Sequence, residues 1–136
     1  MIVVDASVWV SRLLHRDVNH AASRRWLIEQ VGSGRPLVGP SLVIPEVAGA
    51  ISRRTARPNL GHRAVRLLLR VPDLRLVPLD HELAVTAAEL AASLGLRGAD
   101  AIYVAIAQVL GLALVTWDTE QQERGGRIVR VQTPGS

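Results

Sequence analysis

Residues 98–118 read GADAIYVAIAQVLGLALVTWD and join a helix pattern to a strand pattern. Between Asp100 and Leu110 nearly every residue is apolar, which predicts a helix in the centre of the fold, because a helix that is apolar all round is buried. After Gly111, Leu112–Thr116 is typical of a buried strand. The apolar run is shorter than the roughly 20 residues that span a membrane. We therefore expect no membrane segment.

Strand-like and helix-like segments alternate along the rest of the chain. Because strands separated by helices form parallel sheets, this order favours an α/β fold with a mainly parallel sheet covered on both faces. The expected strands are Ile2–Val4, Leu37–Gly39, Leu76–Val77, Leu112–Thr116 and Ile128–Val131, and the expected helices are Ser7–Leu14, Asn19–Val31, Leu42–Arg54, Gly61–Val71, Asp80–Leu94 and Asp100–Leu110. Asn19 and Asp80 are expected helix caps, and Arg57-Pro58-Asn59 is an expected turn.

The composition excludes several kinds of chemistry. The chain has 136 residues, which is enough for one compact domain. It has no cysteine, and this excludes disulfides, cysteine-ligated metals and thiol catalysis. All 16 basic residues are arginine, so no lysine is available for a P-loop or a Schiff base. Since no signal-peptide pattern opens the sequence, we expect a cytoplasmic protein.

Positive charge is concentrated in residues 53–75. The net charge of the chain is +4, whereas this segment, with seven arginines and one acid, carries +6. Such a segment suggests a polyanion or an acidic protein as partner, although a solvated face explains the charge equally well. Three of its arginines fall on one stripe of the expected helix. The seven are Arg53, Arg54, Arg57, Arg63, Arg66, Arg70 and Arg75, and the stripe is Arg63, Arg66 and Arg70.

Four acidic residues interrupt apolar segments. Asp5 ends the first strand, and Asp118 follows the strand that ends near Val115. In parallel α/β sheets ligands bind beyond the carboxyl ends of the strands, so Asp5 and Asp118 are expected at one edge. Asp100 begins the central helix, and Glu46 lies on the apolar stretch 42–51, where an acid is costly.

Each acid also has a simpler interpretation. Asp5 and Asp100 could cap the helices that follow them, and Asp118 could belong to a turn. Glu46 could pair with Arg53 or Arg54, which follow it by about two helical turns. Taken one at a time, these interpretations are the better ones. Taken together, they leave unexplained why every one of these acids lies in an apolar neighbourhood.

Convergence of the four acids would create a cation site. Two carboxylates about 4 Å apart repel by roughly 4 kcal/mol at an effective dielectric constant near 20. Such a cluster takes up protons or holds a cation. Oxygen ligands without cysteine or paired histidines select a hard ion, Mg²⁺ or Mn²⁺. Together with an arginine-rich flank, this arrangement fits the cleavage of phosphodiesters, since such ions activate water and stabilise charge on phosphate oxygens.

Other catalytic patterns are missing from the sequence. The four histidines have no metal-ligand spacing, and no Gly-x-Ser-x-Gly nucleophile elbow occurs. Gly32-Ser33-Gly34 lacks the third glycine of a dinucleotide fingerprint and is interpreted as a helix stop. Trp9 and Trp26 are expected in the core or in a subunit contact. Trp117 is expected to pack in the core, with stacking on a nucleic-acid base as the alternative.

Four short motifs occur in a fixed order along residues 1 to about 131. They are Val-Val-Asp5-Ala-Ser7, Pro-Ser-Leu-Val-Ile-Pro-Glu46, Gly-Ala-Asp100-Ala-Ile-Tyr-Val-Ala and Leu-Val-Thr116-Trp-Asp118. In order and spacing they resemble the PIN-domain ribonuclease family, specifically the VapC-type toxins of bacterial toxin–antitoxin pairs. The resemblance covers residues 1–131 as one PIN-like nuclease domain and leaves residues 132–136 as an expected flexible tail.

The resemblance implies a fold, an activity and a site. The fold would be a three-layer α/β/α arrangement with a mainly parallel five-stranded sheet, and the activity would be endonucleolytic cleavage of RNA with Mg²⁺ or Mn²⁺, restraining translation and growth. A homodimer and an antitoxin that covers the active site are also implied. The implied metal-binding and catalytic residues are Asp5, Glu46, Asp100 and Asp118, and Ser7 and Thr116 would orient acids or water. Glu120 and Glu123 lie near enough to Asp118 to contribute.

The arginine segment leaves two other functions open. With Arg53, Arg54, Arg63, Arg66 and Arg70 contacting RNA, the chain could be a non-catalytic RNA-binding module. Such a module binds RNA in a salt-dependent way and needs no metal. A third interpretation is a metal-stabilised structural protein whose basic face docks an acidic partner. Binding of a partner protein without any RNA binding would distinguish it.

Overall fold

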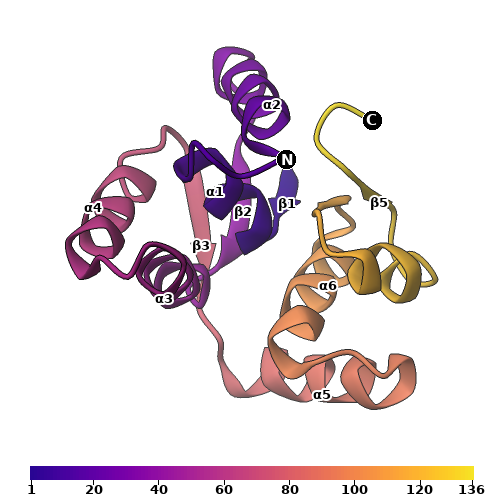
Figure 1. The fold of residues 1–136 in the computed structure, drawn as a ribbon. Helices are drawn as coiled ribbons and strands as arrows, with labels where there is room; N and C mark the ends of the chain where they lie inside the picture. Colours follow the sequence, from indigo (N-terminus) through magenta and orange to yellow (C-terminus); the bar gives the residue numbers. More distant parts are fainter.

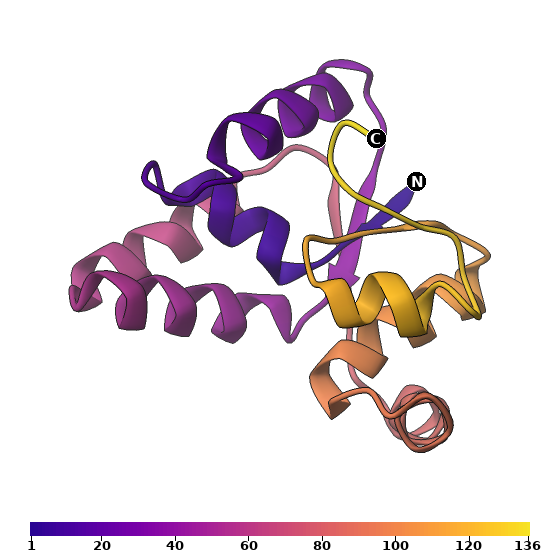
Figure 2. The ribbon, with the colours of Figure 1, turned by 45° about the vertical axis from the view of Figure 1, so that its right-hand side comes forward.

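A computed structural model describes all residues 1–136 and confirms the expected α/β fold. Five strands form one parallel sheet in the order β3-β2-β1-β4-β5. Helices α1 to α4 cover one face, and α5, α6 and the short π-helical segment η1 cover the other (Figures 1 and 2). The strands are β1 (Ile2–Val4), β2 (Leu37–Pro40), β3 (Leu74–Val77), β4 (Leu114–Val115) and β5 (Val131–Gln132).

The helices agree with the alternating pattern of the sequence. Asp80 caps α5 as expected, because its Oδ1 accepts a hydrogen bond of 2.8 Å from the Leu83 N–H. Pro45 lies in the first turn of α3, where a proline is tolerated. The helices are α1 (Ala6–Leu13), α2 (His20–Gly32), α3 (Val43–Thr55), α4 (Pro58–Leu68), α5 (His81–Leu94), α6 (Gly98–Leu110) and η1 (Gln121–Gly125).

Helix α6 lies at the centre of the molecule, as its composition predicts. All seven residues from Ala101 to Ala107 are buried, and Tyr103 and Ile106 are among the largest fully buried side chains. The helix packs across β1, β2 and β4, which contribute buried valines and leucines to the same core. Trp9 and Trp26 are buried in this core too. Asp100, at the start of α6, is therefore held next to the sheet.

The start and end of α4 differ from the prediction. The helix begins at Pro58, so the expected turn at Arg57-Pro58-Asn59 is wrong. Proline at the first helical position has a suitable backbone angle and needs no N–H partner there, which explains the early start. The helix ends at Leu68, so Arg70 lies beyond it and does not continue the stripe of Arg63 and Arg66.

Two further expectations are corrected near the ends of other elements. Asn19 occupies the N-cap position of α2, but its side chain makes no capping hydrogen bond. Strand β5 begins at Val131 rather than Ile128, because the N–H groups of Ile128 and Val129 both bind the carbonyl of Gly125 in a turn. It extends to Gln132, one residue into the expected tail. The segment η1 has no counterpart in the prediction.

No single helix is long and apolar enough to cross a membrane, and only α5 and α6 taken together reach that length and composition, with a bend of 112° between them.

Candidate active site

The strand order creates a switch point between β1 and β4. From β1 the chain builds outward through β2 to β3, and it then crosses the sheet to add β4 and β5 on the other side. Such a reversal opens a crevice at the carboxyl ends of the two central strands. Asp5 follows β1 directly, and Asp118 lies three residues past β4. The expected common edge is therefore present.

Asp5 is buried and hydrogen-bonded through one of its two oxygens. Its side chain caps α1, since Oδ2 accepts from the Ser7 N–H at 3.0 Å. The same oxygen lies 3.1 Å from the Thr116 hydroxyl. Burial raises the pKa of Asp5, although the hydrogen bonds from Ser7 and Thr116 oppose the shift. The capping role is thus confirmed, and Oδ1 makes no bond to the protein.

Ser7 and Thr116 join the ends of the two central strands. The Ser7 hydroxyl accepts from the Trp117 N–H at 3.0 Å and lies 3.3 Å from the Thr116 hydroxyl. Thr116 is fully buried, and its oxygen accepts from the Asp118 N–H at 3.0 Å. The two hydroxyls therefore hold the backbone on which Asp5 and Asp118 sit.

Glu46 reaches the same region from the first turn of α3. The Tyr103 hydroxyl donates to its Oε1 at 2.6 Å. Burial raises the pKa of Glu46, as do the negative charges of Asp5 and Asp100. The expected alternative of a bond to Arg53 or Arg54 is wrong, because Arg54 instead pairs with Asp17 at 2.8 Å.

Asp100 and Asp118 approach the crevice from the other face of the sheet. Asp100 lies in the first turn of α6 and does not cap it, because Arg97 holds the N-cap position. Burial raises the pKa of Asp100, and the charges of Asp118 and Asp5 raise it further, while Arg97 lowers it. Asp118 forms a turn, since its Oδ1 accepts from the N–H groups of Glu120 and Gln121 at 2.8 and 3.1 Å.

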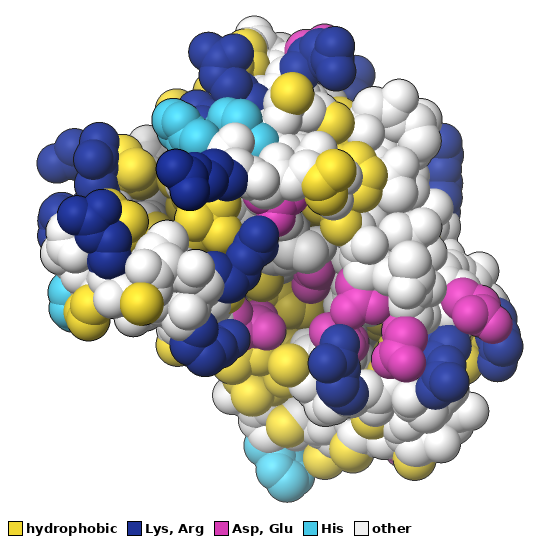
Figure 3. Space-filling model, viewed as in Figure 1, with side chains coloured by type: hydrophobic (Ala, Val, Ile, Leu, Met, Phe, Trp, Pro, Cys, Tyr) yellow, Lys and Arg dark blue, Asp and Glu magenta, His cyan; other side chains and the backbone are white.

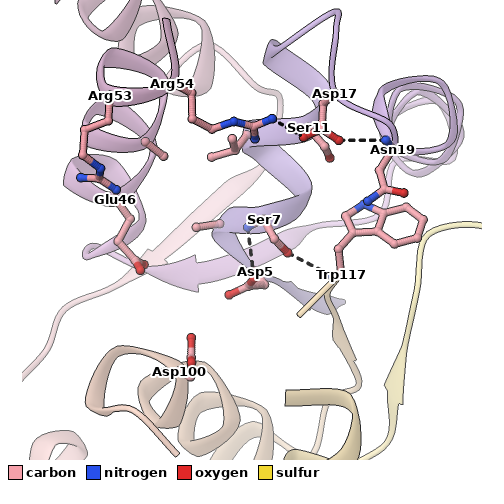
Figure 4. Close-up of a pocket in the computed structure, with 13 residues that line it drawn as sticks. Asp5, Ser7, Ser11, Asp17, Asn19, Glu46, Arg53, Arg54, Asp100 and Trp117 are labelled. Carbon is pink, nitrogen blue, oxygen red and sulfur yellow. Dashed lines mark hydrogen bonds and ion pairs between the residues drawn. The ribbon is translucent and has the colours of Figure 1, made fainter. Parts of the chain in front are cut away.

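A cavity of about 430 Å³ brings three of the four acids together. Figure 4 shows the carboxylates of Asp5, Glu46 and Asp100 pointing into one space, with Trp117 at its side. Asp118 does not line this cavity. It is connected to the cavity residue Asp100 by Arg97, which donates a hydrogen bond to each of the two acids. On the surface, acidic side chains gather around the same hollow, with basic side chains along its rim (Figure 3).

The chemistry of these side chains fits a hard divalent cation. All the converging donors are carboxylate oxygens. Burial raises the pKa values of Asp5, Glu46 and Asp100, and repulsion from neighbouring acids raises those of Glu46 and Asp100 further. A bound Mg²⁺ or Mn²⁺ would relieve that repulsion. The side chains do not already form a closed group of three or more ligands. Ion binding by three of these carboxylates would therefore need their side chains to move closer together.

Comparison with models of protein families identifies the family of this chain. The model of the PIN domain matches residues 2–127. The chain belongs to the PIN domain family. The family and the three-layer fold that the motifs predicted are thereby confirmed. No curated protein matches the sequence.

Several solved structures share the fold of this PIN domain. One is VapC20 of Mycobacterium tuberculosis, a sarcin-ricin loop cleaving toxin, at 19% identity and a TM-score of 0.74, covering 90% of this chain and 94% of that chain. FitAcB from Neisseria gonorrhoeae has 22% identity and a TM-score of 0.70, with 98% of both chains covered. A toxin-antitoxin complex from Klebsiella pneumoniae has 18% identity, a TM-score of 0.64 and 98% coverage of both chains.

The arginine segment of the PIN domain is divided between different surfaces. Arg53 and Arg54 line the acidic cavity. Arg63 lines a second cavity, and Arg66 and Arg70 line neither of the two. Of the five arginines expected to contact RNA, only Arg53 and Arg54 thus line the acidic cavity. Glu120 and Glu123 are exposed and stay outside the acidic cavity as well.

The second cavity is an apolar groove of about 1190 Å³ between α1, α2, α3 and α4. Twelve of its lining residues are hydrophobic, and Leu67 at its side is 40% exposed. Asp17 and Arg54, which form an ion pair, line both the groove and the acidic cavity. Five arginines surround the apolar floor: Arg12, Arg16, Arg54, Arg57 and Arg63.

Three residues of the site were missed from the sequence. Tyr103 is the only tyrosine, and it follows Asp100 by one helical turn, which is a usable signal in an otherwise apolar helix. Gln121 is fully buried and lies 2.7 Å from the Thr116 hydroxyl, but its segment has no periodicity that could reveal it. Arg97 binds both Asp100 and Asp118, although it reads as an ordinary exposed arginine.

Proposed function

We propose that this PIN domain is a divalent-metal-dependent endoribonuclease of the cytoplasm. It would be the VapC-type toxin of a toxin–antitoxin pair and would cleave RNA to restrain translation and growth. The observation that carries the proposal is the convergence of Asp5, Glu46 and Asp100, from three separate segments, in one cavity with raised pKa values. The shared fold with a toxin that cleaves the sarcin-ricin loop supports RNA as the substrate.

The acids have different roles in this proposal. Asp5, Asp100 and Glu46 would hold the ion, since their carboxylates face the common cavity. Asp118 would act beside them by orienting water or a second ion. When bound, Mg²⁺ or Mn²⁺ supplies Lewis acidity and positive charge at a phosphodiester. Ser7 and Thr116 keep Asp5 in place through hydrogen bonds, and Tyr103 does the same for Glu46.

The rim of the cavity supplies contacts for RNA. Arg53 is exposed, lines the cavity and has no ion-pair partner, so its guanidinium is available to a phosphate. Arg54 is held by Asp17 and would need to exchange that partner. The ring of Trp117 is anchored by a 2.8 Å bond from its Nε1 to the Ser23 hydroxyl and forms one wall of the cavity.

Cleavage of purified RNA tests the proposal. We expect cleavage with Mg²⁺ or Mn²⁺, none with EDTA, and a loss of about 100-fold or more in Asp5→Asn and Asp100→Asn, in line with removing a metal ligand. Asp73→Asn is a matched control, because Asp73 lies on the surface at a φ of 55°, which asparagine adopts readily. Cleavage that survives both substitutions, or that needs no metal, would refute the proposal.

The apolar groove is the surface we propose for the antitoxin. A segment with apolar side chains and flanking acids complements its floor and its ring of arginines. Because Asp17 and Arg54 line both cavities, a segment bound in the groove would reach the entrance of the acidic cavity. Arg57→Glu and Arg63→Glu should weaken copurification with a coexpressed antitoxin, whereas Arg130→Glu should not.

We also propose a homodimer, which the resemblance implies. Val109 and Leu110 at the end of α6 are 65% and 49% exposed, which is consistent with an apolar contact between subunits. Sedimentation equilibrium tests this directly, and a monomer at all concentrations would contradict it.

A further inference from the structure

One guanidinium connects two acids that are 18 positions apart in the sequence. The Nε of Arg97 donates to Asp100 Oδ2 at 3.1 Å, and its Nη2 donates to Asp118 Oδ2 at 3.2 Å. The side chain of Arg97 is 73% exposed, while those of Asp100 and Asp118 are 13% and 20% exposed. The arginine therefore extends from the solvent side over two acids that are largely covered. Its side chain makes no other hydrogen bond.

The remaining oxygens of the two acids are not equivalent. Asp118 Oδ1 already accepts from two backbone N–H groups, those of Glu120 and Gln121. Its Oδ2 is thus the one oxygen that is not committed to the backbone, and Arg97 holds it. Asp100 Oδ1 stays free of protein partners. A cation can consequently reach Asp100 Oδ1 while Arg97 is in place, whereas at Asp118 Oδ2 it meets the guanidinium as a competitor.

Helix stability does not explain an arginine at this position. Arg97 is the N-cap residue of α6, where the helix dipole is positive and a cation is unfavourable. Its side chain makes no capping hydrogen bond. The two carboxylates are therefore the interaction that accounts for its placement. Two exposed ion-pair contacts are weak individually, so the side chain can leave for solvent at low cost.

We propose that Arg97 is a built-in counter-ion that competes with a divalent cation for Asp118 and Asp100. This inference rests on the proposed function, because it assumes that Asp5 and Asp100 bind the ion. Arg97 neutralises the acids while the ion is away, and ion binding to Asp118 requires the guanidinium to rotate out. The residue thereby sets how much Mg²⁺ or Mn²⁺ is needed to load the site, without being a ligand itself.

Calorimetric titration with Mn²⁺ tests the inference without relying on cleavage. Arg97→Gln should bind Mn²⁺ about threefold to tenfold more tightly than the wild type, since two exposed ion pairs no longer compete. Without metal, the same variant should melt at a lower temperature than the wild type, because the repulsion of Asp100 and Asp118 is no longer relieved. Arg75→Gln removes an exposed arginine paired with Asp73 and should leave Mn²⁺ binding unchanged.

A double variant separates direct competition from a general effect of charge. In the Asp118→Asn background, Arg97→Gln should increase the affinity for Mn²⁺ much less than it does in the wild-type background. The reason is that the side-chain oxygen for which Arg97 and the ion compete has lost its charge. An equal gain in both backgrounds, or unchanged or weaker Mn²⁺ binding in Arg97→Gln, would overturn the inference. If instead the wild type binds no Mn²⁺, or Asp5→Asn binds it equally well, the proposed metal site itself fails.

Discussion

At the scale of single residues, Asp5 combines two demands that oppose each other. Its side chain accepts from the Ser7 N–H at the start of α1, and burial makes the charged form of the same side chain costly. Desolvation raises its pKa, so in the absence of a cation the folded protein binds its proton more tightly than the unfolded chain does. The stability that this proton supplies is present at low pH and is lost as the pH rises through the raised pKa.

The raised pKa of Asp5 predicts how the stability of the Asp5→Asn variant, relative to the wild type, changes with pH. Without metal, the variant should gain stability relative to the wild type as the pH rises, by up to about 1.4 kcal/mol for each unit of pKa shift. Asparagine can still accept from the Ser7 N–H, so the cap survives. Urea unfolding in EDTA at several pH values measures the difference. A difference that stays constant between about pH 4 and about pH 8 would contradict the burial argument.

Tyr103 supports Glu46 in a way that also depends on pH. Burial and the nearby acids raise the pKa of Tyr103, so its hydroxyl stays protonated and donates. Tyr103→Phe should cost about 1–3 kcal/mol of unfolding free energy where Glu46 is charged, because a carboxylate then loses its donor. The loss should shrink at acidic pH, where Glu46 is protonated. Denaturant titrations at both pH values check this, and an equal loss at each would point to packing alone.

Single residues also show how much of the candidate site could be predicted from the sequence. The four acids could be predicted because each one interrupts an apolar segment, and three of them meet in one cavity. Arg97 and Gln121 could not, since an exposed arginine and a glutamine in an irregular segment carry no periodic signal. Their roles depend on which segments the sheet brings together, and local sequence does not contain that information.

At the scale of elements, the α3–α4 pair forms the wall that carries Glu46, Arg53 and Arg54. The two helices pack closely at Gly61, where an added Cβ would lie 2.8 Å from the Ala48 carbonyl oxygen and 3.3 Å from the Ser52 Cβ. Element boundaries were predicted well where a cap or stop residue acts locally, as at Asp80 of α5. They were predicted poorly at α4 and β5, where Pro58 and the turn at Gly125 determine the first residue of the element.

Gly61→Ala tests this close approach. Alanine favours helices over glycine by roughly 1 kcal/mol, but the clash with a backbone oxygen should outweigh this and give a net loss of about 1–3 kcal/mol in unfolding free energy. Gly32→Ala in α2 is the matched control, since an added Cβ meets no atom within 4 Å there. It should be neutral or slightly stabilising. Thermal unfolding compares the two variants, and a stabilised Gly61→Ala would show that α3 and α4 are not tightly packed.

At the scale of the whole molecule, the order of the strands determines where the site lies. The reversal between β1 and β4 places Asp5 and Asp118 at one edge, and the helices on opposite faces deliver Glu46 and Asp100 to the same crevice. The parallel α/β fold could be predicted from alternating segments. The closing of Arg97 over Asp100 and Asp118 could not, because it depends on the three-dimensional placement of two distant segments.

The most direct test of the central claim is an anomalous difference map from crystals of this chain soaked in Mn²⁺. The claim is that distant acids hold one divalent cation at the switch point of the sheet. It predicts a strong peak within ligand distance of Asp5 and Asp100, in the cavity that Glu46 also lines. Asp5→Asn crystals should lose this peak. A map with no peak in the cavity, or with manganese bound only at other side chains, would contradict the account.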